Sequence, residues 1–350
     1  MLETLLEKNA AWSAGNGPQA EMTVCTRGGI VRNLADFSFP WRCSDDERAA
    51  VADRVANAIK RSGLLPGSQY IPLDHAEPRE LRFLLERRLI TEDLIRAEGP
   101  RGVHISADQD LCVMVNGLHH LHIQAIAPGL QPEEVWKRLN LADDQLARRL
   151  DYTFDSNLGY LGPELARLGT GLRLSVLVHL PALALANAIR SLTQSLRDQW
   201  HLLEGAFGGT HEARGDLYWL SNQSTLGRSE DEIVFHLGHF AGMILSQEQS
   251  ARTVLQSESP RSLEDRVGRA WGMVRGARLL DFDEALALLS SLRLGHALGM
   301  LEGCAVHQFN DLLLSAQRAH IESRRGHDCD ELALGAERAD LFQSLFAAHD

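Results

Sequence analysis

Apolar positions along the chain fit short strands in its first part and helices in its last part. Strands are predicted where short apolar runs are bounded by turn residues, over residues 21–31, 103–105, 111–115, 121–126 and 216–221. Helices are predicted where apolar residues recur at helical spacing, over residues 45–62, 78–86, from 91 onward and over 132–150. Beyond residue 229 nearly every segment is predicted to be helical, including 262–277, 281–290, 294–318 and 330–347.

Local signals refine this assignment. Ser44 followed by Glu47 is a capping-box pattern, which starts a helix. The most apolar stretch, residues 172–189, contains polar and helix-breaking residues and is predicted to be a buried helix. Residues 159–171 and 204–215 are glycine-rich and are predicted to be loops, and neither matches a nucleotide-binding glycine motif.

The pattern divides the chain into three parts. Residues 1–20 form an N-terminal segment, residues 21–255 a catalytic-type domain of strands and helices, and residues 261–350 a helical domain. Pro260 lies in the candidate linker between the last two parts. Two domains are also expected because 350 residues are many for a single core.

Charge and composition narrow the classes of partner. The net charge of −12, from 35 basic and 47 acidic residues, argues against nucleic acid, which needs a positive surface. No apolar run reaches the roughly 18 to 20 residues that span a bilayer, so no membrane partner is expected. The first residues are acidic where a signal peptide would be basic, and a cytoplasmic location is therefore expected. Five isolated cysteines indicate neither a disulfide framework nor a zinc ribbon.

Five segments in one order resemble the ATP:guanido phosphotransferases, most closely the bacterial protein-arginine kinases. They are residues 26–40, 101–130, 150–161, 169–183 and 220–234. Residues 293–301 are also similar to the C-terminal domain of that branch, so the resemblance extends from about residue 21 to the end. It implies an α+β fold, with an antiparallel sheet flanked by helices and then an all-helical domain. It also implies a protein substrate or partner and a homodimer formed through the C-terminal helices.

Transfer of phosphate to a guanidinium needs carboxylates that hold this group and accept its proton. The resemblance assigns this role to an Asn-Glu-Glu-Asp-His stretch, which here reads Asn-Gly-Leu-His-His over residues 116–120. Gly117 and Leu118 therefore stand where acids are expected. Glu212 aligns with the last acid of the second glycine-rich loop and is the candidate residual acid.

The phosphates of ATP need several positive charges and oriented donors around them. The resemblance gives this role to a residual anion site formed by Arg27, Arg32, Arg173 and Ser175. Residues without a positive charge replace family arginines at Gly29, His122 and Glu204. A reversed charge is the most costly change, because like charges about 4 Å apart repel by roughly 4 kcal/mol at an effective dielectric near 20.

The absence of the expected acids and of several expected arginines favours a pseudokinase, which acts as a binding or regulatory scaffold and needs no cofactor. The alternative is an active protein-arginine kinase that uses ATP and Mg²⁺ in a rearranged site. In that case the acid would come from Glu164 or Glu212, with Asp108 and Asp110 as weaker candidates. The missing positive charges would come from Arg88, Arg167 or Arg214.

Two further hypotheses concern metal binding and regulation. His120 and His122 lie on one face of a predicted strand and are weak metal-ligand candidates, together with His104 or His211. No acid or cysteine follows at ligand spacing, so no metal site is expected. Near the C-terminus the resemblance implies a phosphoarginine pocket, of which Arg338 is the remnant. The simpler interpretation is that Arg338 is a solvent-exposed residue of a C-terminal helix.

Overall fold

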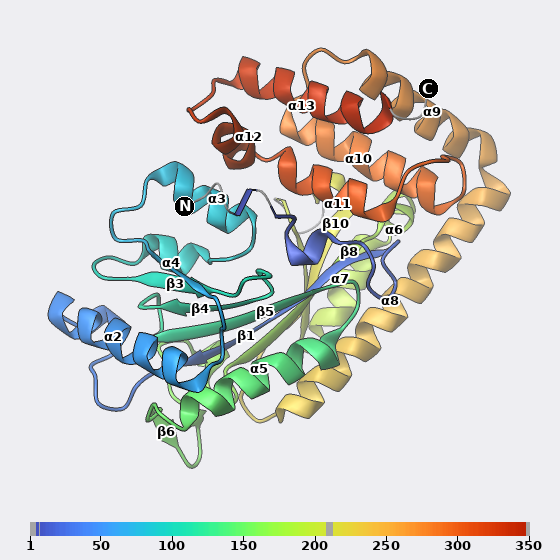
Figure 1. Ribbon diagram of the computed structural model, residues 1–350. Helices are drawn as coiled ribbons and strands as arrows, with labels where there is room; N and C mark the ends of the chain where they lie inside the picture. The colour runs from blue at the N-terminus through green and yellow to red at the C-terminus, as the bar shows by residue number, and fades with distance from the viewer. Residues whose placement is uncertain (1–4, 7, 208–212, 348–350) are drawn as a thin grey trace.

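A single eight-stranded sheet forms the centre of the structure, a computed structural model that describes residues 5–6, 8–207 and 213–347 (Figure 1). The strand order is β2-β3-β4-β5-β1-β8-β10-β9, and all neighbouring strands are antiparallel. The strands are β1 (Thr23–Arg32), β2 (Gln69–Pro72), β3 (Gly102–Ile105), β4 (Leu111–Val115), β5 (Leu121–Pro128), β8 (Leu172–His179), β9 (His201–Gly205) and β10 (Leu217–Asn222). A separate small hairpin joins β6 (Phe154–Asp155) and β7 (Gly159–Tyr160).

Two helices cover one face of this sheet. Helix α5 (Pro132–Ala147) packs on β1 and β5, and α8 (Glu230–Glu258) packs on β8 and β10. Alternate strand residues such as Ile30, Leu174 and Val176 point to these helices and join the main apolar core. The opposite face of the central strands carries both polar side chains and a second apolar cluster that packs against the C-terminal helices.

The remaining helices lie around the edges and one end of the sheet (Figure 1). In the sheet-containing part they are α2 (Asp45–Ser62), α3 (Pro78–Glu86), α4 (Glu92–Arg96), α6 (Pro181–Leu185) and α7 (Ile189–Arg197). The C-terminal group consists of α9 (Pro260–Gly276), α10 (Phe282–Ala297), α11 (Val306–Ser315), α12 (Arg318–Arg325) and α13 (Glu331–Ala347). This arrangement confirms the predicted fold class, an α+β unit with an antiparallel sheet followed by a helical region. The proposed division near Pro260 stays a prediction.

Several predicted elements are present with their predicted caps. The side chain of Ser44 accepts a hydrogen bond from the Glu47 amide at 3.2 Å, and the Glu47 carboxylate accepts one from the Ser44 amide at 2.9 Å. This reciprocal pair is the capping box that starts α2. The hairpin of β3, β4 and β5 is also formed as predicted.

The predicted helix over residues 172–189 is wrong for its first eight residues, which form strand β8, whereas Pro181–Leu185 form a short helix. β8 lies between β1 and β10 near the middle of the sheet. Leu174 and Val176 enter the core under α5 and α8, while Leu177 packs into a second core beneath the C-terminal helices. A strand with apolar residues on both faces loses its alternation, so its pattern can be mistaken for a buried helix.

Two other boundaries were also predicted incorrectly. The glycine-rich stretch 204–215 begins inside strand β9, which pairs with β10 and contains Glu204. The predicted helix 294–318 is interrupted between α10 and α11, where Gly299 and Gly303 adopt φ values of +72° and +80°. Glycine adopts these left-handed angles at little cost, so the chain can turn at this point.

A buried polar network joins the sheet to the C-terminal helices. On β8, His179 Nε2 lies 2.9 Å from Ser290 Oγ of α10, and Ser290 donates to the Asp216 carboxylate at 2.5 Å. Burial, and then the charges of Arg293 and Arg252, lower the pKa of His179 far below its ordinary value of 6.5. His179 is therefore neutral in the folded protein.

Within the described ranges no helix has the length and apolar character needed to cross a membrane.

We expect the folded protein to lose stability as the pH falls below about 6.5. In that range the unfolded chain binds a proton at His179 that the folded chain does not bind, so the free energy of unfolding decreases by up to about 1.4 kcal/mol per pH unit for this group. Urea unfolding between pH 7.5 and 5 should show a shallower pH dependence for His179→Gln. His75, which is exposed, provides the matched control His75→Gln. An unchanged slope in His179→Gln would contradict this assignment.

Candidate functional site

Strand register places a row of polar side chains on the face of the sheet opposite α5 and α8. Arg27 on β1 pairs with Ser175 on β8, which in turn pairs with Ser221 on β10. The two serine hydroxyl oxygens are 2.7 Å apart. Arg173 and Trp219 precede these serines by two residues and therefore lie on the same face.

Four guanidinium groups gather on this face, and we call them the arginine cluster: Arg27, Arg88, Arg167 and Arg173. The guanidinium of Arg27 lies over the Trp219 ring at 4.6 Å, and that of Arg88 lies over the same ring at 4.8 Å. Burial, and then the charges of Arg88, Arg173 and Arg167, lower the pKa of Arg27 to about 10. Burial, followed by the charge of Arg173, likewise lowers the pKa of Arg167 to about 10. The four charges therefore act on one another.

Few ion pairs compensate the arginine cluster, although Glu164 and Asp93 lie near enough to Arg167 to oppose the lowering of its pKa. Within the part of the chain that the structure describes, Arg27, Arg88 and Arg167 form no ion pair. Arg173 lies 3.9 Å from the Glu204 carboxylate, and both side chains are substantially exposed. Such an exposed pair contributes little. Desolvated positive charge without an acidic partner is costly to the folded chain and favours the binding of an anion.

A small cavity adjoins the arginine cluster at Gly117 and Leu118, the positions where the resemblance led us to expect acids. It is lined by Gly117 and Leu118, by Asp93 and Glu164, and by Arg167 of the cluster. Glu164 lies 3.4 Å from His119 Nε2, and this hydrogen bond lowers the pKa of Glu164, with Arg167 contributing further. Two carboxylates therefore reach the cavity from other parts of the chain. Its volume is about 20 Å³, which is room for roughly one water molecule.

Of the residues predicted for the anion site, Arg32 lies apart from the arginine cluster. It is buried, and its Nη2 contacts the Asp143 carboxylate at 2.6 Å. Its guanidinium also stacks on Tyr160 at 3.5 Å. These contacts satisfy its charge within the protein. Arg27, Arg173 and Ser175 lie together as described above.

Gly29 and His122, two of the positions where the resemblance led us to expect arginines, are in direct contact. A Cβ atom at Gly29 would lie 2.3 Å from His122 Nε2, so the His122 ring occupies the space that a side chain at position 29 would need. Burial, and then the charge of Arg167, lower the pKa of His122 far below 6.5. The neutral ring therefore adds no positive charge to the site.

The other candidate residues are distributed as follows. His120 accepts a hydrogen bond from the Leu34 amide at Nδ1 and does not share a site with His122. Among the described residues no three His, Cys, Asp or Glu side chains are placed to hold a metal ion. Arg214 pairs with Asp283 at 2.9 Å, and Asp110 pairs with Arg138 at 2.9 Å. Glu212 and His211 lie outside the described residues.

Arg338 lies in the interior of the helical region. It is 4% exposed, and it donates to the carbonyl oxygens of Ala316 at 2.9 Å and Leu280 at 3.5 Å. Its guanidinium lies over Phe282 at 5.6 Å. The alternative of a solvated residue is therefore wrong, because Arg338 holds three segments of the helical region together.

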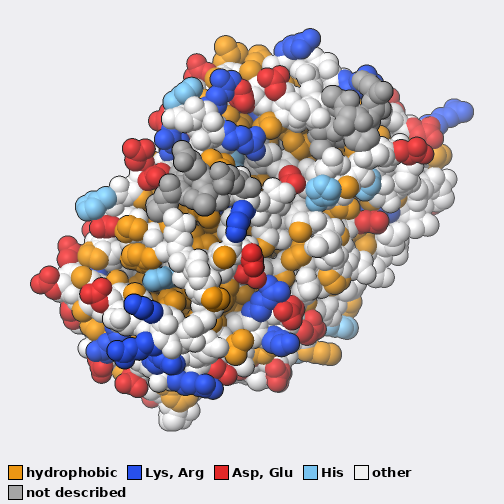
Figure 2. All heavy atoms as spheres, in the orientation of Figure 1, with side chains coloured by type: hydrophobic (Ala, Val, Ile, Leu, Met, Phe, Trp, Pro, Cys, Tyr) orange, Lys and Arg blue, Asp and Glu red, His pale blue; other side chains and the backbone are white. Residues whose placement is uncertain are grey.

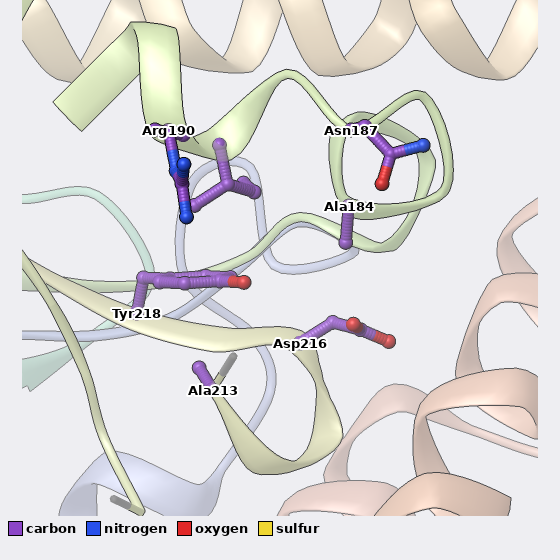
Figure 3. Close-up of a pocket in the computed structure, with 7 residues that line it drawn as sticks. Ala184, Asn187, Arg190, Ala213, Asp216 and Tyr218 are labelled. Atoms are coloured by element: carbon purple, nitrogen blue, oxygen red, sulfur yellow. The ribbon is translucent and has the colours of Figure 1, made fainter. Parts of the chain in front are cut away.

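Figure 2 shows Lys and Arg side chains interspersed with Asp and Glu over the visible face. A hollow of about 580 Å³ lies beside α6 and α7, with Arg190 and Asp216 among its lining residues (Figure 3). It is also lined by Tyr218, whose side chain points to the face opposite that of Trp219. This hollow is therefore separate from the arginine cluster.

Comparison with known proteins identifies the family. The profile of the ATP:guanido phosphotransferase C-terminal catalytic domain matches residues 50–251, and that of the protein-arginine kinase McsB C-terminal domain matches residues 260–350. The protein-arginine kinase of Moorella thermoacetica is 35% identical over 345 residues, which are 98% of this chain and 99% of the relative. The chain belongs to the protein-arginine kinase family. The protein-arginine kinase of Pelotomaculum thermopropionicum is 36% identical over 348 residues, which are 99% of this chain and 98% of the relative.

Solved structures agree with this family assignment at the level of the fold. A lombricine kinase structure has a TM-score of 0.58 at 24% identity and covers 68% of this chain and 69% of that chain. A duplicated taurocyamine kinase from Schistosoma mansoni, with bound transition state analog components, has a TM-score of 0.59 at 22% identity. It covers 75% of this chain and 39% of that chain. The predicted family and its sheet architecture are thus confirmed.

Three residues of this family member's site were not anticipated as site residues: Trp12, Asp93 and Trp219. Asp93 is recognisable in the sequence only as an acid in the first turn of a helix. Trp12 belongs to a segment outside the expected catalytic domain, and Trp219 to a strand without a motif at that position. The packing of α4 and of the N-terminal segment places Asp93 beside Arg167 and Trp12 beside Arg88, whereas Trp219 lies in the sheet itself, on β10.

We expect the buried pair of Arg32 and Asp143 to contribute to stability rather than to ligand binding. Asp143→Asn leaves the Arg32 charge buried without an acid and should lower the free energy of unfolding by about 3–5 kcal/mol. The exposed pair of Arg54 and Asp36 provides the control, because Asp36→Asn should change the free energy of unfolding by less than about 1 kcal/mol. Urea unfolding measures both. Similar effects of the two substitutions would contradict this role of Arg32.

Proposed function

We propose that this chain binds ATP at the arginine cluster and transfers its terminal phosphoryl group to an arginine side chain of a protein. The observation that carries this proposal is the group of four guanidiniums without ion-paired acids among the described residues, except for the exposed contact to Glu204. Polyphosphate is the kind of ligand that several converging guanidiniums bind well. The cavity next to Arg167 supplies a place for the acceptor.

The arginine cluster fits a polyphosphate both in charge and in arrangement. Bound ATP with Mg²⁺ would supply the transferable phosphoryl group. Arg27, Arg88 and Arg173 would hold its oxygens, with the hydroxyl groups of Ser175 and Ser221 beside them. Arg167 belongs to both the arginine cluster and the cavity, so it would stabilise the charge that develops between donor and acceptor.

Asp93 and Glu164 would perform the acid–base work at the acceptor. The lowered pKa keeps Glu164 ionised, which suits it to hold the acceptor guanidinium, and its carboxylate would accept one of the guanidinium protons as the N–P bond forms. The N–P bond forms at the guanidinium nitrogen as the P–O bond to the nucleoside diphosphate breaks. The 20 Å³ cavity must open for this step. An open hollow of about 440 Å³ shares Asp93, Gly117 and Leu118 with it and gives the acceptor a way in.

A second candidate function keeps anion binding but omits transfer. It is favoured by Gly117 and Leu118 at the expected acid positions, by the small cavity, and by Glu204 near Arg173. In this reading the chain is a pseudokinase that acts as a regulatory scaffold for a protein partner. Both readings include a homodimer formed through the C-terminal helices. Both also keep the cytoplasmic location that the sequence led us to expect.

We predict that the purified chain with Mg-ATP phosphorylates arginine in an unfolded model protein, as measured by mass spectrometry. Glu164→Gln should lower kcat/KM by about 10²–10⁴-fold, since it removes the base. Arg167→Gln should lower it by about 10²–10³-fold, since it removes one transition-state donor. Arg190→Gln, on the other face of the sheet, should have no effect.

The same samples separate the two candidate functions. Calorimetric titration that detects ATP binding without any phosphoarginine product would exclude transfer and favour the scaffold. If ATP does not bind at millimolar concentration, the proposed ATP binding and transfer are wrong, and a scaffold that needs no cofactor is favoured. Equal loss of activity in Arg190→Gln would also contradict the assignment of the site to the arginine cluster.

A further inference from the structure

Two tryptophans enclose one guanidinium of the arginine cluster. The Arg88 guanidinium lies 5.0 Å from the centre of the Trp12 ring and 4.8 Å from that of the Trp219 ring. Trp12 is 1% exposed and lies in the 3-10 turn η1 (Ala11–Ser13), whereas Trp219 lies on β10. We infer that Trp12 and Trp219 are positioning residues that hold Arg88 for an anion, which makes the N-terminal segment part of the site. This inference rests on the anion binding proposed above.

The backbone at Arg88 is fixed from both sides. Arg88 directly follows the C-cap of α3 and has a φ of +63°, which is unfavourable for a residue with a Cβ atom. Its carbonyl oxygen accepts a hydrogen bond from the Gln124 side chain of β5 at 2.6 Å. The Trp12 indole donates to the carbonyl oxygen of the preceding residue, Arg87, at 3.2 Å. Strained conformations persist where surrounding contacts impose them, and they occur preferentially at functional sites.

The contacts of Arg88 differ from those of the buried arginines with structural roles. Arg87 donates hydrogen bonds to the Gln109 side chain at 3.0 Å and to the Lys8 carbonyl oxygen at 2.6 Å, so its guanidinium is bound within the protein. Arg88 Nε is buried without any hydrogen-bond partner among the described residues. The nearby Cys25 thiol does not supply a negative charge, because burial raises its pKa to about 11. The aromatic faces alone hold the Arg88 guanidinium, and its donors are left for a ligand.

Trp219 links Arg88 to a second member of the arginine cluster. The same indole ring contacts Arg27 at 4.6 Å, so it sets the separation between the two guanidiniums. Two like charges on one aromatic ring repel each other, and an anion that bridges them would relieve that repulsion. Loss of Trp219 should therefore weaken anion binding more than loss of Trp12, whose ring lies under one guanidinium of the arginine cluster, that of Arg88.

A double-mutant cycle tests this inference with tripolyphosphate as the probe. Calorimetric titration of the full chain would compare Trp12→Leu, Arg88→Met and the double variant with the parent chain. We expect Trp12→Leu to raise the Kd by up to about 10-fold, because a desolvated cation–π contact contributes on this scale. If Trp12 acts through Arg88, the double variant should bind no more weakly than Arg88→Met alone. Additive effects, or an unchanged Kd in Trp12→Leu, would overturn the inference.

Companion variants distinguish positioning from loss of folding. Trp12→Phe keeps an aromatic face and should bind nearly as well as the parent chain. Trp219→Leu alters a partly exposed side chain and provides the same test if Trp12→Leu fails to fold. Trp200, which is 57% exposed, provides the control Trp200→Leu, whose Kd should not change. The slope of log Kd against log salt should become shallower in Arg88→Met and in Trp12→Leu, but not in Trp200→Leu. An unchanged slope in Trp12→Leu would count against positioning.

Failure of this inference can be told apart from failure of the proposed function. Tripolyphosphate binding does not require phosphoryl transfer. A chain that binds tripolyphosphate without forming phosphoarginine would refute transfer, and the double-mutant cycle of Trp12 and Arg88 would still test the tryptophan roles. A chain that forms phosphoarginine and binds tripolyphosphate equally well with and without Trp12 would refute only the tryptophan roles. If tripolyphosphate does not bind to the parent chain, the anion site and the tryptophan roles are both wrong.

Discussion

Mutual repulsion within the arginine cluster is the constraint on which the organisation of this site depends. Burial, and then the charges of Arg88, Arg173 and Arg167, lower the pKa of Arg27, and burial increases the cost of holding these charges together. The fold tolerates this cost because the register of β1 and β8 fixes Arg27 and Arg173, and two indole rings hold Arg88. The sheet therefore presents concentrated positive charge on one face of a chain whose net charge is −12.

Buried arginines elsewhere in the chain show what an arginine with a structural role looks like. Arg252 contacts the Glu248 carboxylate at 2.7 Å, and Glu248 also accepts two amide hydrogen bonds from the start of α6. Arg293 donates to Asn310 at 2.6 Å and to the carbonyl oxygen of Ala20 at 2.7 Å. Each of these guanidiniums has oxygen acceptors within the protein. The arginine cluster departs from this pattern, and such departures are expected at functional sites.

The sequence was sufficient for the family, the fold class and most helices, because caps and periodicity are local signals. It failed for β8, where apolar residues on both faces hide the alternation of a strand. It also could not show that Asp93 and Glu164 approach Gly117 and Leu118, since these residues lie in three separate segments. The roles of Arg88 and Arg167 were open for the same reason. Their meeting with Arg27 depends on how α3 and the loop before β8 pack on the sheet, which no short motif encodes.

The most direct test of the account is a crystal structure of the chain with ATP and Mg²⁺. We expect phosphate density in contact with Arg27, Arg88, Arg167 and Arg173, with Arg88 still between Trp12 and Trp219. Arg32 should remain paired with Asp143. Phosphate density at another place in the molecule, or none at a saturating concentration, would contradict the claim that the arginine cluster is the anion site.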